Sequence, residues 1–428
     1  MVKKGLILFL VLITIVTALN FTALAAPKQV TIKMSNWLQV EVSTAGIFKK
    51  MIAEFERKNP GIKVETIGLP FNQYKDQVLV MSTSGNAPDV IMGNSQMMVS
   101  FDGSGILTPL KGLISSKVLN DIFPNNLEGT TFQGKIMALS WAPHPIAMFY
   151  NKELFKQAGL DPEKAPKTWD EMMNAAKKVA ALKKDKDGNQ IYGIALPNAK
   201  VSHSGSVAMG VIYTYGGQFI DRKGKVVFDN QGTKDALKFF KDMVDSGVMP
   251  SGMEIKDVRG LFASGKVGMI FDGDFGRNTF RTLSGKGQEF DNIMGVGIIP
   301  TGKTGKSETV YTEHELAIAK TSKQKKAAAA LVEFLMSKEN MIIYHKDQAI
   351  LSARKSIASL PEMNEDNYMR VFNKQSETAR PLPATSPFFD NAMLEVTKAM
   401  ERILITNEDI NKVVKETQTT IKDLYQQK

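Results

Sequence analysis

The chain has 428 residues, 43% of them hydrophobic, and no cysteine. That length and composition predict a large globular core spread over more than one domain. The lack of cysteine excludes disulfide bonds, thiol catalysis and a cysteine-linked lipid. The net charge of +10 comes from scattered basic residues that are not interleaved with aromatic residues, which argues against a nucleic-acid-binding surface.

Residues 1–25 have the pattern of a secretory signal peptide. Lys3 and Lys4 precede an uncharged run from Gly5 to Leu24, and Ala23-Leu24-Ala25 matches a small-x-small cleavage site. We therefore predict cleavage near Ala25 and a mature chain free in the periplasm. A retained membrane anchor is the alternative, because the run is long enough to span a bilayer. No later segment is predicted to span a membrane.

The mature chain opens with alternating strand and helix patterns. Apolar and polar side chains alternate over Val30–Asn36, which predicts a strand with one buried face. Apolar residues at helical spacing over Ile47–Phe55 predict a helix that ends at Asn59-Pro60-Gly61. A second strand is predicted over Ile62–Gly68, and a third apolar run ends at Gly93. This order predicts the crossover unit of a parallel sheet.

Later segments continue the alternation. Thr168 precedes an amphipathic helix, and Glu171, three residues further on, completes a capping-box pattern. Ser322 precedes another amphipathic helix, with Ala328 and Leu331 on its apolar face. No internal repeat or low-complexity tract is present. The predicted fold class is α/β, with two lobes that each contain a sheet.

One stretch matches a nucleotide-binding motif without its context. GIIPTGKT, residues 297–304, has the spacing of a phosphate-binding loop. Such a loop requires a helix to begin at its end, because the helix N-terminus supplies the N–H groups that bind phosphate. Here Gly305 follows, and Val310, Leu316 and Ile318 then predict a strand. We therefore predict that the chain is not an ATPase.

Metal-binding and catalytic patterns are incomplete. Loops that begin at Asp185 and Asp272 place Leu196 and Leu283 where a calcium loop requires glutamate. The four histidines are far apart in the sequence, and no nucleophile-elbow motif is present. The prediction is no metal, no cofactor and no catalytic residue.

Two acids stand out at the end of an apolar run. Asp272 and Asp274 flank Gly273 directly after GMIF, which predicts a buried strand followed by a turn. Such acids can accept hydrogen bonds from the hydroxyl groups of a ligand. They can also be the paired carboxylates of a glycoside hydrolase, whose separation a sequence does not give. Both interpretations stay open at this point.

Several segments together resemble one protein family. They are EFERKNPGIKVE (54–65), GNAPDVIM (85–92), FYNKELFKQAGLDPEKAPKTWDEM (149–172), YGGQFIDRKGK (215–225) and LFASGKVGMIFDGDF (261–275), and the amphipathic helix after Ser322 with its FLMS ending continues the match. In this order they resemble the extracellular solute-binding proteins of ABC importers, in particular the group that includes maltose-binding protein and many oligosaccharide receptors. The resemblance covers nearly all of the mature chain.

The resemblance implies a periplasmic-binding-protein fold, in which two lobes joined by crossing hinge segments close on a ligand. The first lobe would comprise residues 26–143 plus about 312–342, and the second 144–311 plus about 343–428. The implied function is capture of a solute, a mono- or oligosaccharide, for delivery to the membrane permease of an ABC transporter. No catalytic step is implied, and the expected protein is a monomer.

The candidate binding residues are aromatic, acidic and amide side chains near predicted strand ends, where ligands of α/β sheets bind. An aromatic ring can cover the apolar face of a pyranose, while planar polar groups bind its hydroxyls. These candidates are Trp37, Gln39, Asn94, Trp141, Asp272, Asp274, Phe275, Tyr311, Glu313 and Arg380.

Three points stay open. His314 departs from the glycines that family members carry around this position, so it either shapes specificity or packs the hinge. The same fold can bind a polyamine or a glycerophosphodiester, and clustered acids favour the polyamine of these two. A secreted glycoside hydrolase is the remaining alternative.

Overall fold

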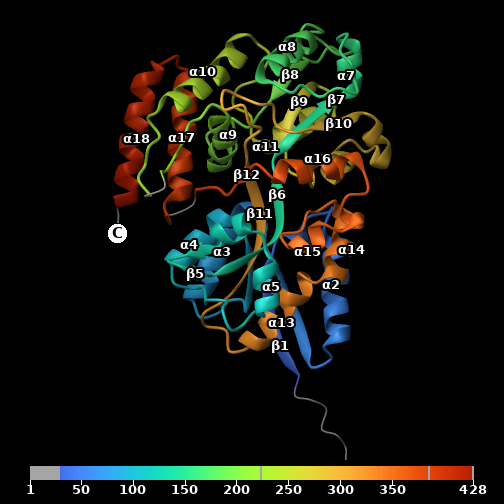
Figure 1. Cartoon of the computed structure of the whole chain (residues 1–428), viewed down its shortest axis with the longest axis vertical. Coiled ribbons are helices and arrows are strands. Elements are labelled where there is room, and N and C mark those ends of the chain that lie inside the picture. Colours follow the sequence, from blue (N-terminus) through green and yellow to red (C-terminus); the bar gives the residue numbers. More distant parts are fainter. Residues whose placement is uncertain (1–28, 222–223, 384–385, 427–428) are drawn as a thin grey trace, which may run out of the picture.

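Figure 1 shows two lobes stacked along the long axis of the molecule and joined near the middle by β6 (Ala138–Pro145) and β11 (Thr309–Ile318). The computed structural model describes residues 29–221, 224–383 and 386–426. The predicted signal peptide lies outside these residues. Within the described part of the chain, no helix combines the length and apolar character needed to cross a membrane.

The first lobe is built on a six-stranded sheet in the order β12-β11-β3-β1-β2, with β6 also paired to β11. β1 (Val30–Asn36) runs parallel to β2 (Ile62–Gly68) and β3 (Val90–Gly93), which confirms the predicted crossover unit. β11 runs antiparallel to both β3 and β6. The other strands of this region are β12 (Ala379–Arg380), β4 (Thr131–Phe132) and β5 (Lys135–Ile136).

The helices of the first lobe bury apolar faces against this sheet. α2 (Ala45–Lys58) buries the predicted stripe from Ile47 to Phe55, because residues three and four apart share one face of a helix. The other helical elements are η1 (Leu38–Val40), α3 (Phe71–Thr83), α4 (Ser95–Gly103), α5 (Ser116–Asp121), α6 (Pro124–Glu128), α13 (Lys325–Leu335), α14 (Lys338–Gln348), α15 (Lys355–Ala358) and η3 (Pro361–Met363).

The second lobe is built on a four-stranded sheet in the order β10-β7-β9-β8. All six residues of β9 (Val267–Asp272) are buried, as predicted for the strand that leads to the paired acids. The other strands are β7 (Ala147–Asn151), β8 (Tyr192–Ala195) and β10 (Met294–Gly297). The helical elements are α7 (Lys152–Gln157), α8 (Trp169–Ala180), α9 (Ser202–Thr214), α10 (Gln231–Asp245), α11 (Ile255–Ala263), α12 (Gly276–Leu283), η2 (Gly287–Asn292), α16 (Asn367–Ser376), α17 (Phe389–Leu404) and α18 (Ile410–Gln426).

The last return of the chain to the second lobe comes later than the boundary expected near residue 342. Tyr344, Ile350 and Ile357 lie in the core of the first lobe together with β1 and α2. Residues 349–351 alternate between the two cores, since Ala349 and Leu351 contact the apolar cluster around β9. The segment after α14 therefore forms a further junction between the lobes.

Two predictions from local patterns have clear outcomes. Residues 297–304 are followed by β11 and not by a helix, so the phosphate-loop context is absent, as predicted. Thr168 caps α8 by accepting the Glu171 N–H at 3.2 Å. Glu171 does not return to the Thr168 amide as the capping box predicts, but accepts the N–H of Lys167 at 2.7 Å.

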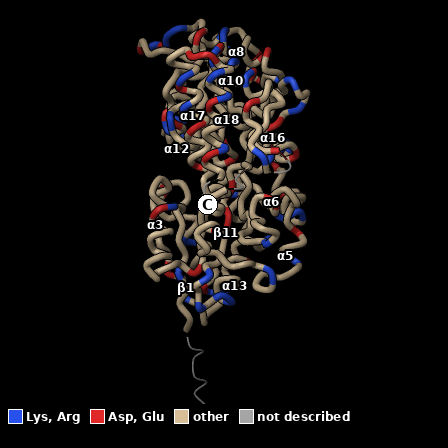
Figure 2. Tube along the Cα trace, turned by 90° about the vertical axis from the view of Figure 1, so that its left-hand side faces the viewer, with Lys and Arg blue, Asp and Glu red and all other residues tan. Residues whose placement is uncertain are grey.

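Basic and acidic residues are interspersed over both lobes in Figure 2, without a broad patch of one sign in that view. Many pair locally, for example Lys238 with Asp242 along α10. Among the described residues, no cluster of His, Cys, Asp and Glu side chains is arranged to hold a metal ion.

Candidate functional site

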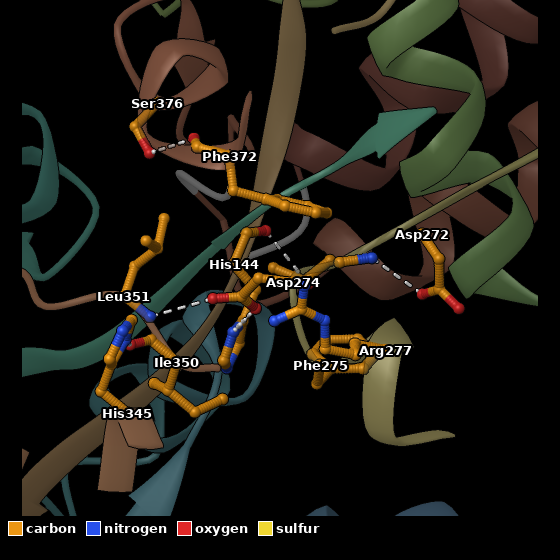
Figure 3. Close-up of polar contacts among 12 residues, drawn as sticks. His144, Asp272, Asp274, Phe275, Arg277, His345, Ile350, Leu351, Phe372 and Ser376 are labelled. Carbon is orange, nitrogen blue, oxygen red and sulfur yellow. Dashed lines mark hydrogen bonds and ion pairs between the residues drawn. The ribbon is translucent and has the colours of Figure 1, made fainter. Parts of the chain in front are cut away.

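The candidate site lies between the lobes, where β6 and β11 leave the first lobe and β9 ends in the second. Because strands of both sheets end or cross between the lobes, residues far apart in the sequence meet here. Figure 3 shows Asp274, from the turn after β9, pointing toward His144 of β6 and toward the backbone of Leu351. The paired acids of the sequence are therefore part of the junction between the lobes.

Asp274 connects three segments of the chain. Its Oδ1 lies 2.5 Å from His144 Nδ1, and its Oδ2 accepts the Leu351 N–H at 3.0 Å. The side chains of Asp274 and His144 are 0% and 1% exposed. Both acceptor oxygens are thus used within the protein, and the Nδ1–H of His144 is the natural donor to the carboxylate.

Asp272 is held by an arginine that sequence analysis did not select. Arg259, on α11, donates from Nε and Nη2 to the two carboxylate oxygens at 2.6 and 2.9 Å, a bidentate pair. The guanidinium also lies 5.2 Å from the centre of the Phe275 ring. A quarter of the Arg259 side chain is exposed, so part of the guanidinium stays accessible to solvent.

Two further groups face this ion pair. Glu41, which follows η1 in the first lobe, interacts electrostatically with Arg259 across the lobe boundary. His203 lies at the start of α9. Burial, and then the nearby Arg259 charge, lower the pKa of His203 to about 4. His203 is therefore a neutral imidazole at neutral pH, and the Arg259–Asp272 pair is bordered by groups from both lobes.

A row of aromatic rings crosses the lobe boundary. The centre of the Trp37 ring lies 5.3 Å from that of the exposed Phe71 ring and 5.2 Å from that of the His314 imidazole. His314 lies 4.4 Å from His144, which in turn lies 5.1 Å from Phe275. All four contacts are edge-to-face, the geometry that ring quadrupoles favour. We call Trp37, His314, His144 and Phe275 the aromatic row.

Two polar atoms inside the aromatic row lack partners. His144 Nε2 and His314 Nδ1 are buried and have no hydrogen-bond partner among the described residues. Burial, and then the neighbouring His144, lower the pKa of His314 well below its usual value, so this ring is neutral. A buried nitrogen without a partner raises the free energy of this arrangement, and a ligand hydroxyl would remove that penalty.

A buried pair of glutamates lies beside the aromatic row on β11. Glu315 Oε1 accepts the Ser95 hydroxyl at 2.8 Å, and Glu313 Oε2 accepts from Asn126 Nδ2 at 3.2 Å. Burial raises the pKa of both carboxyls, and the charge of Glu313 raises that of Glu315 further. Two carboxylates in one dry site do not both ionise easily, so the charge of one raises the pKa of the other.

The other sequence-selected residues have roles within the protein. Trp141 lies in the core of the first lobe, where its indole donates to Leu335 O and stacks on Tyr344. Tyr311 is buried and donates to the carbonyl oxygen of Ser376. The structure therefore does not bring Trp141 to the aromatic row.

Three more candidates lie at the edges of the lobe boundary. Arg380 pairs with Glu308 and lies 5.0 Å from the Tyr213 ring. Asn94 caps α4 by accepting the Met97 N–H at 3.0 Å. Gln39 is half-buried, and its backbone N–H donates to Asn36 at 2.9 Å.

The sequence profile of the bacterial extracellular solute-binding proteins matches residues 41–342, well over half of the chain. This chain belongs to that family. It is a solute-binding protein of the kind that serves ABC transporters. The family consists of binding proteins and not of enzymes.

Relatives and solved structures agree with this assignment. A binding protein of Brucella abortus is 25% identical over 88% of this chain and 89% of its own length. A solute-binding protein of Thermotoga lettingae, bound with α-D-tagatose, has a TM-score of 0.81 at 22% identity and covers 93% of this chain and 100% of its own. Maltose-bound MalE3 of T. maritima has a TM-score of 0.80 at 23% identity, over 92% and 100%. These likenesses establish the fold with two α/β lobes.

Two residues of the candidate site, His144 and Arg259, were not indicated by sequence patterns. His144 and Arg259 lie within a strand and a helix whose local patterns are fully accounted for by packing. They meet the paired acids only through the packing of β6 and α11 against the end of β9. One available signal was the isolated His144 in the apolar run ALSWAPHP, where a titratable group is unusual in a buried strand.

Proposed function

We propose that this receptor captures a saccharide between its lobes in the periplasm and delivers it to the permease of an ABC importer. The observation that carries the proposal is the aromatic row, with its two unpartnered imidazole nitrogens beside the Arg259–Asp272 pair. The row combines apolar ring surface with hydrogen-bonding atoms. That combination matches a sugar ring, which has an apolar face and a rim of hydroxyls.

The proposed roles of individual residues follow from the ring surfaces and hydrogen-bonding atoms that they can offer to a ligand. Phe275 and Trp37 would contact the apolar face of the sugar, one from each lobe. Because His144 Nδ1 faces Asp274, its Nε2 would be the ring atom that forms a hydrogen bond with a ligand hydroxyl. Arg259 would donate to a ring or hydroxyl oxygen from Nη1, since its Nε and Nη2 are directed at Asp272.

Lobe closure would be driven by these contacts. Groups from the first lobe (Trp37, Glu41) and the second (Phe275, Arg259) reach a common ligand only when the lobes approach. A ligand shifts the open–closed equilibrium by its difference in affinity for the two states. A hydroxyl that satisfies His144 Nε2 in the closed state supplies such a difference.

Related proteins of known structure support a saccharide as the solute. The T. lettingae protein was solved with tagatose and the T. maritima protein with maltose. A polyamine fits this site less well, because Asp272 is paired with Arg259 and Asp274 is bound by His144. A glycerophosphodiester fits less well, because Asp272 in turn neutralises the Arg259 charge that would attract its phosphate. The same bonds count against a hydrolase, since neither carboxyl is free to act as acid or nucleophile.

The remaining parts of the proposal concern location and assembly. We expect the signal peptide to be removed near Ala25, and the mature receptor to act as a monomer that needs no metal or cofactor. Its partners would be the solute and the membrane permease, which recognises the closed form.

Thermal unfolding of residues 26–428 against mono- and oligosaccharides, polyamines and glycerophosphodiesters tests the proposal. A ligand at 100 times its dissociation constant adds about 2.7 kcal/mol to stability, a clear rise in midpoint. We expect a shift from one sugar class, with intact sugar recovered afterwards. A shift from a polyamine or diester alone would overturn the saccharide, and cleaved sugar would overturn transport.

Two tryptophans provide a matched pair of variants. Trp37→Phe alters the aromatic row and should raise the Kd of the sugar roughly three- to tenfold, as expected for a changed aromatic contact. Trp141→Phe removes a core hydrogen bond and should lower stability by about 1 kcal/mol while leaving Kd unchanged. Equal effects of both variants on Kd would contradict the proposed site.

A further inference from the structure

Two polar contacts hold the lobes together along one side of the candidate site. Lys75, on α3 of the first lobe, places Nζ 2.5 Å from Asp390 Oδ2, on α17 of the second. Gln96, on α4, donates to the Ser206 hydroxyl of α9 at 2.5 Å. Figure 1 shows α3 and α4 below α9 and α17 on the same side of the molecule. We call these two contacts the clasp.

The clasp is a packed interface and not an isolated surface contact. The side chains of Lys75 and Asp390 are 31% and 22% exposed, and Ser206 is buried. The Pro387 ring also lies close to α4 here, since a Cβ added at Gly103 would lie 3.0 Å from Pro387 Cβ. The α9 and α17 helices that receive these contacts are themselves in close contact.

The residues of the clasp directly follow two residues, Tyr74 and Ser95, that pack beside the aromatic row. Ser95 binds Glu315 beside the aromatic row, and the next residue, Gln96, makes the contact to Ser206. On the other side, Tyr74 packs against Trp37 at 5.0 Å, and the next residue, Lys75, reaches Asp390. On both α3 and α4, a residue that packs beside the aromatic row is therefore followed directly by a residue of the clasp.

We infer that the clasp limits ligand length, so that the closed receptor favours a short saccharide over a longer one. A longer chain extending along α3 and α4 has to separate Gln96 from Ser206 and Lys75 from Asp390. It loses the closed-state contacts that a short sugar retains. This inference rests on the proposed function, because it concerns which saccharide the same site accepts.

Affinity measurements on sugars of defined length test the inference. The probes are saccharides built from glucose, galactose and mannose, each with one, two and five units. The native chain should bind the five-unit sugar at least tenfold more weakly than the preferred short one. Lys75→Ala and Asp390→Ala should each weaken short-sugar binding about threefold and reduce that length discrimination.

Charge exchange and a matched pair provide the controls. The double variant Lys75→Asp with Asp390→Lys should restore the length discrimination. Lys234→Ala breaks the Lys234–Asp229 pair, which is also half-buried, with both side chains 23% exposed, but lies within the second lobe. It should leave the discrimination unchanged. Unchanged discrimination in Lys75→Ala, or native binding of the five-unit sugar as tight as the short one, would overturn the inference.

Cross-linking separates failure of the clasp from failure of the saccharide proposal. The chain has no cysteine, so Lys75→Cys with Asp390→Cys introduces a unique pair for a short bismaleimide. Transient closure should cross-link this pair without sugar, the short sugar should accelerate the reaction, and the five-unit sugar should not. Absence of cross-linking overturns the clasp whatever the solute, whereas cross-linking that no sugar accelerates overturns the saccharide and, with it, the length limit.

Discussion

The buried Glu313–Glu315 pair makes a direct prediction about stability and pH. Burial, followed by the charge of Glu313, raises the pKa of Glu315 well above its ordinary value of 4.5. A group whose pKa is raised in the folded state binds its proton more tightly there than in the unfolded chain. Its contribution to stability is therefore complete below the ordinary value and is lost as the pH rises through the raised pKa.

Replacing Glu315 by Gln removes this titration while keeping an acceptor for the Ser95 hydroxyl. Because one proton is involved, the difference in unfolding free energy between variant and native chain should grow by at most about 1.4 kcal/mol per pH unit above pH 4.5. Titrating groups that do not interact with this pair are common to both chains and cancel in the difference.

Urea unfolding between pH 5 and 9 measures this difference, provided that both chains unfold in a single transition. Glu65→Gln, at an exposed position of β2, is the control and should show no pH-dependent difference. Native and Glu315→Gln curves that stay parallel across the whole range would refute the raised pKa of Glu315.

Two further predictions concern the groups beside the aromatic row. Arg259→Met leaves Asp272 buried without its bidentate partner, and should lower the unfolding free energy by about 2 kcal/mol and weaken sugar binding; unchanged stability in urea would contradict the ion pair. His203→Gln should remove a loss of stability on acidification, because the His203 pKa of about 4 lies below its unfolded value of 6.5 and its contribution disappears as the pH falls through that window. Native and His203→Gln chains that lose stability equally between pH 6.5 and 4 would contradict this.

The sequence predicts the elements well where one periodicity dominates. Val30–Asn36 forms β1 at the predicted residues, and the apolar stripe of α2 is buried as its spacing indicates. The buried strand before Asp272 is also confirmed. In each case a local pattern and the final packing agree, so no long-range information is needed.

The site is less accessible from sequence because it is made of long-range contacts. His144 and Asp274 are 130 residues apart, and no local pattern links a histidine in β6 to a turn after β9. Trp141 illustrates the opposite problem, since a tryptophan near a strand end fits both ligand contact and core packing. The structure places it in the core, against Tyr344.

The expected lobe boundary near residue 342 shows how topology escapes pattern analysis. Met341 and Tyr344 are buried in the first lobe, while Ile343 between them is half exposed. An apolar run of this kind gives no sign of which lobe it packs against. Only the contacts of α14 and α15 with the first-lobe core decide the matter.

Small-angle X-ray scattering of residues 26–428, with and without a saturating amount of the sugar that raises the unfolding midpoint, tests capture by closure most directly. We predict that the sugar-bound profile matches the structure described above and that the sugar-free protein has a larger radius of gyration. Identical profiles at saturation would contradict the account, because the ligand would then bind without bringing the two halves of the aromatic row together.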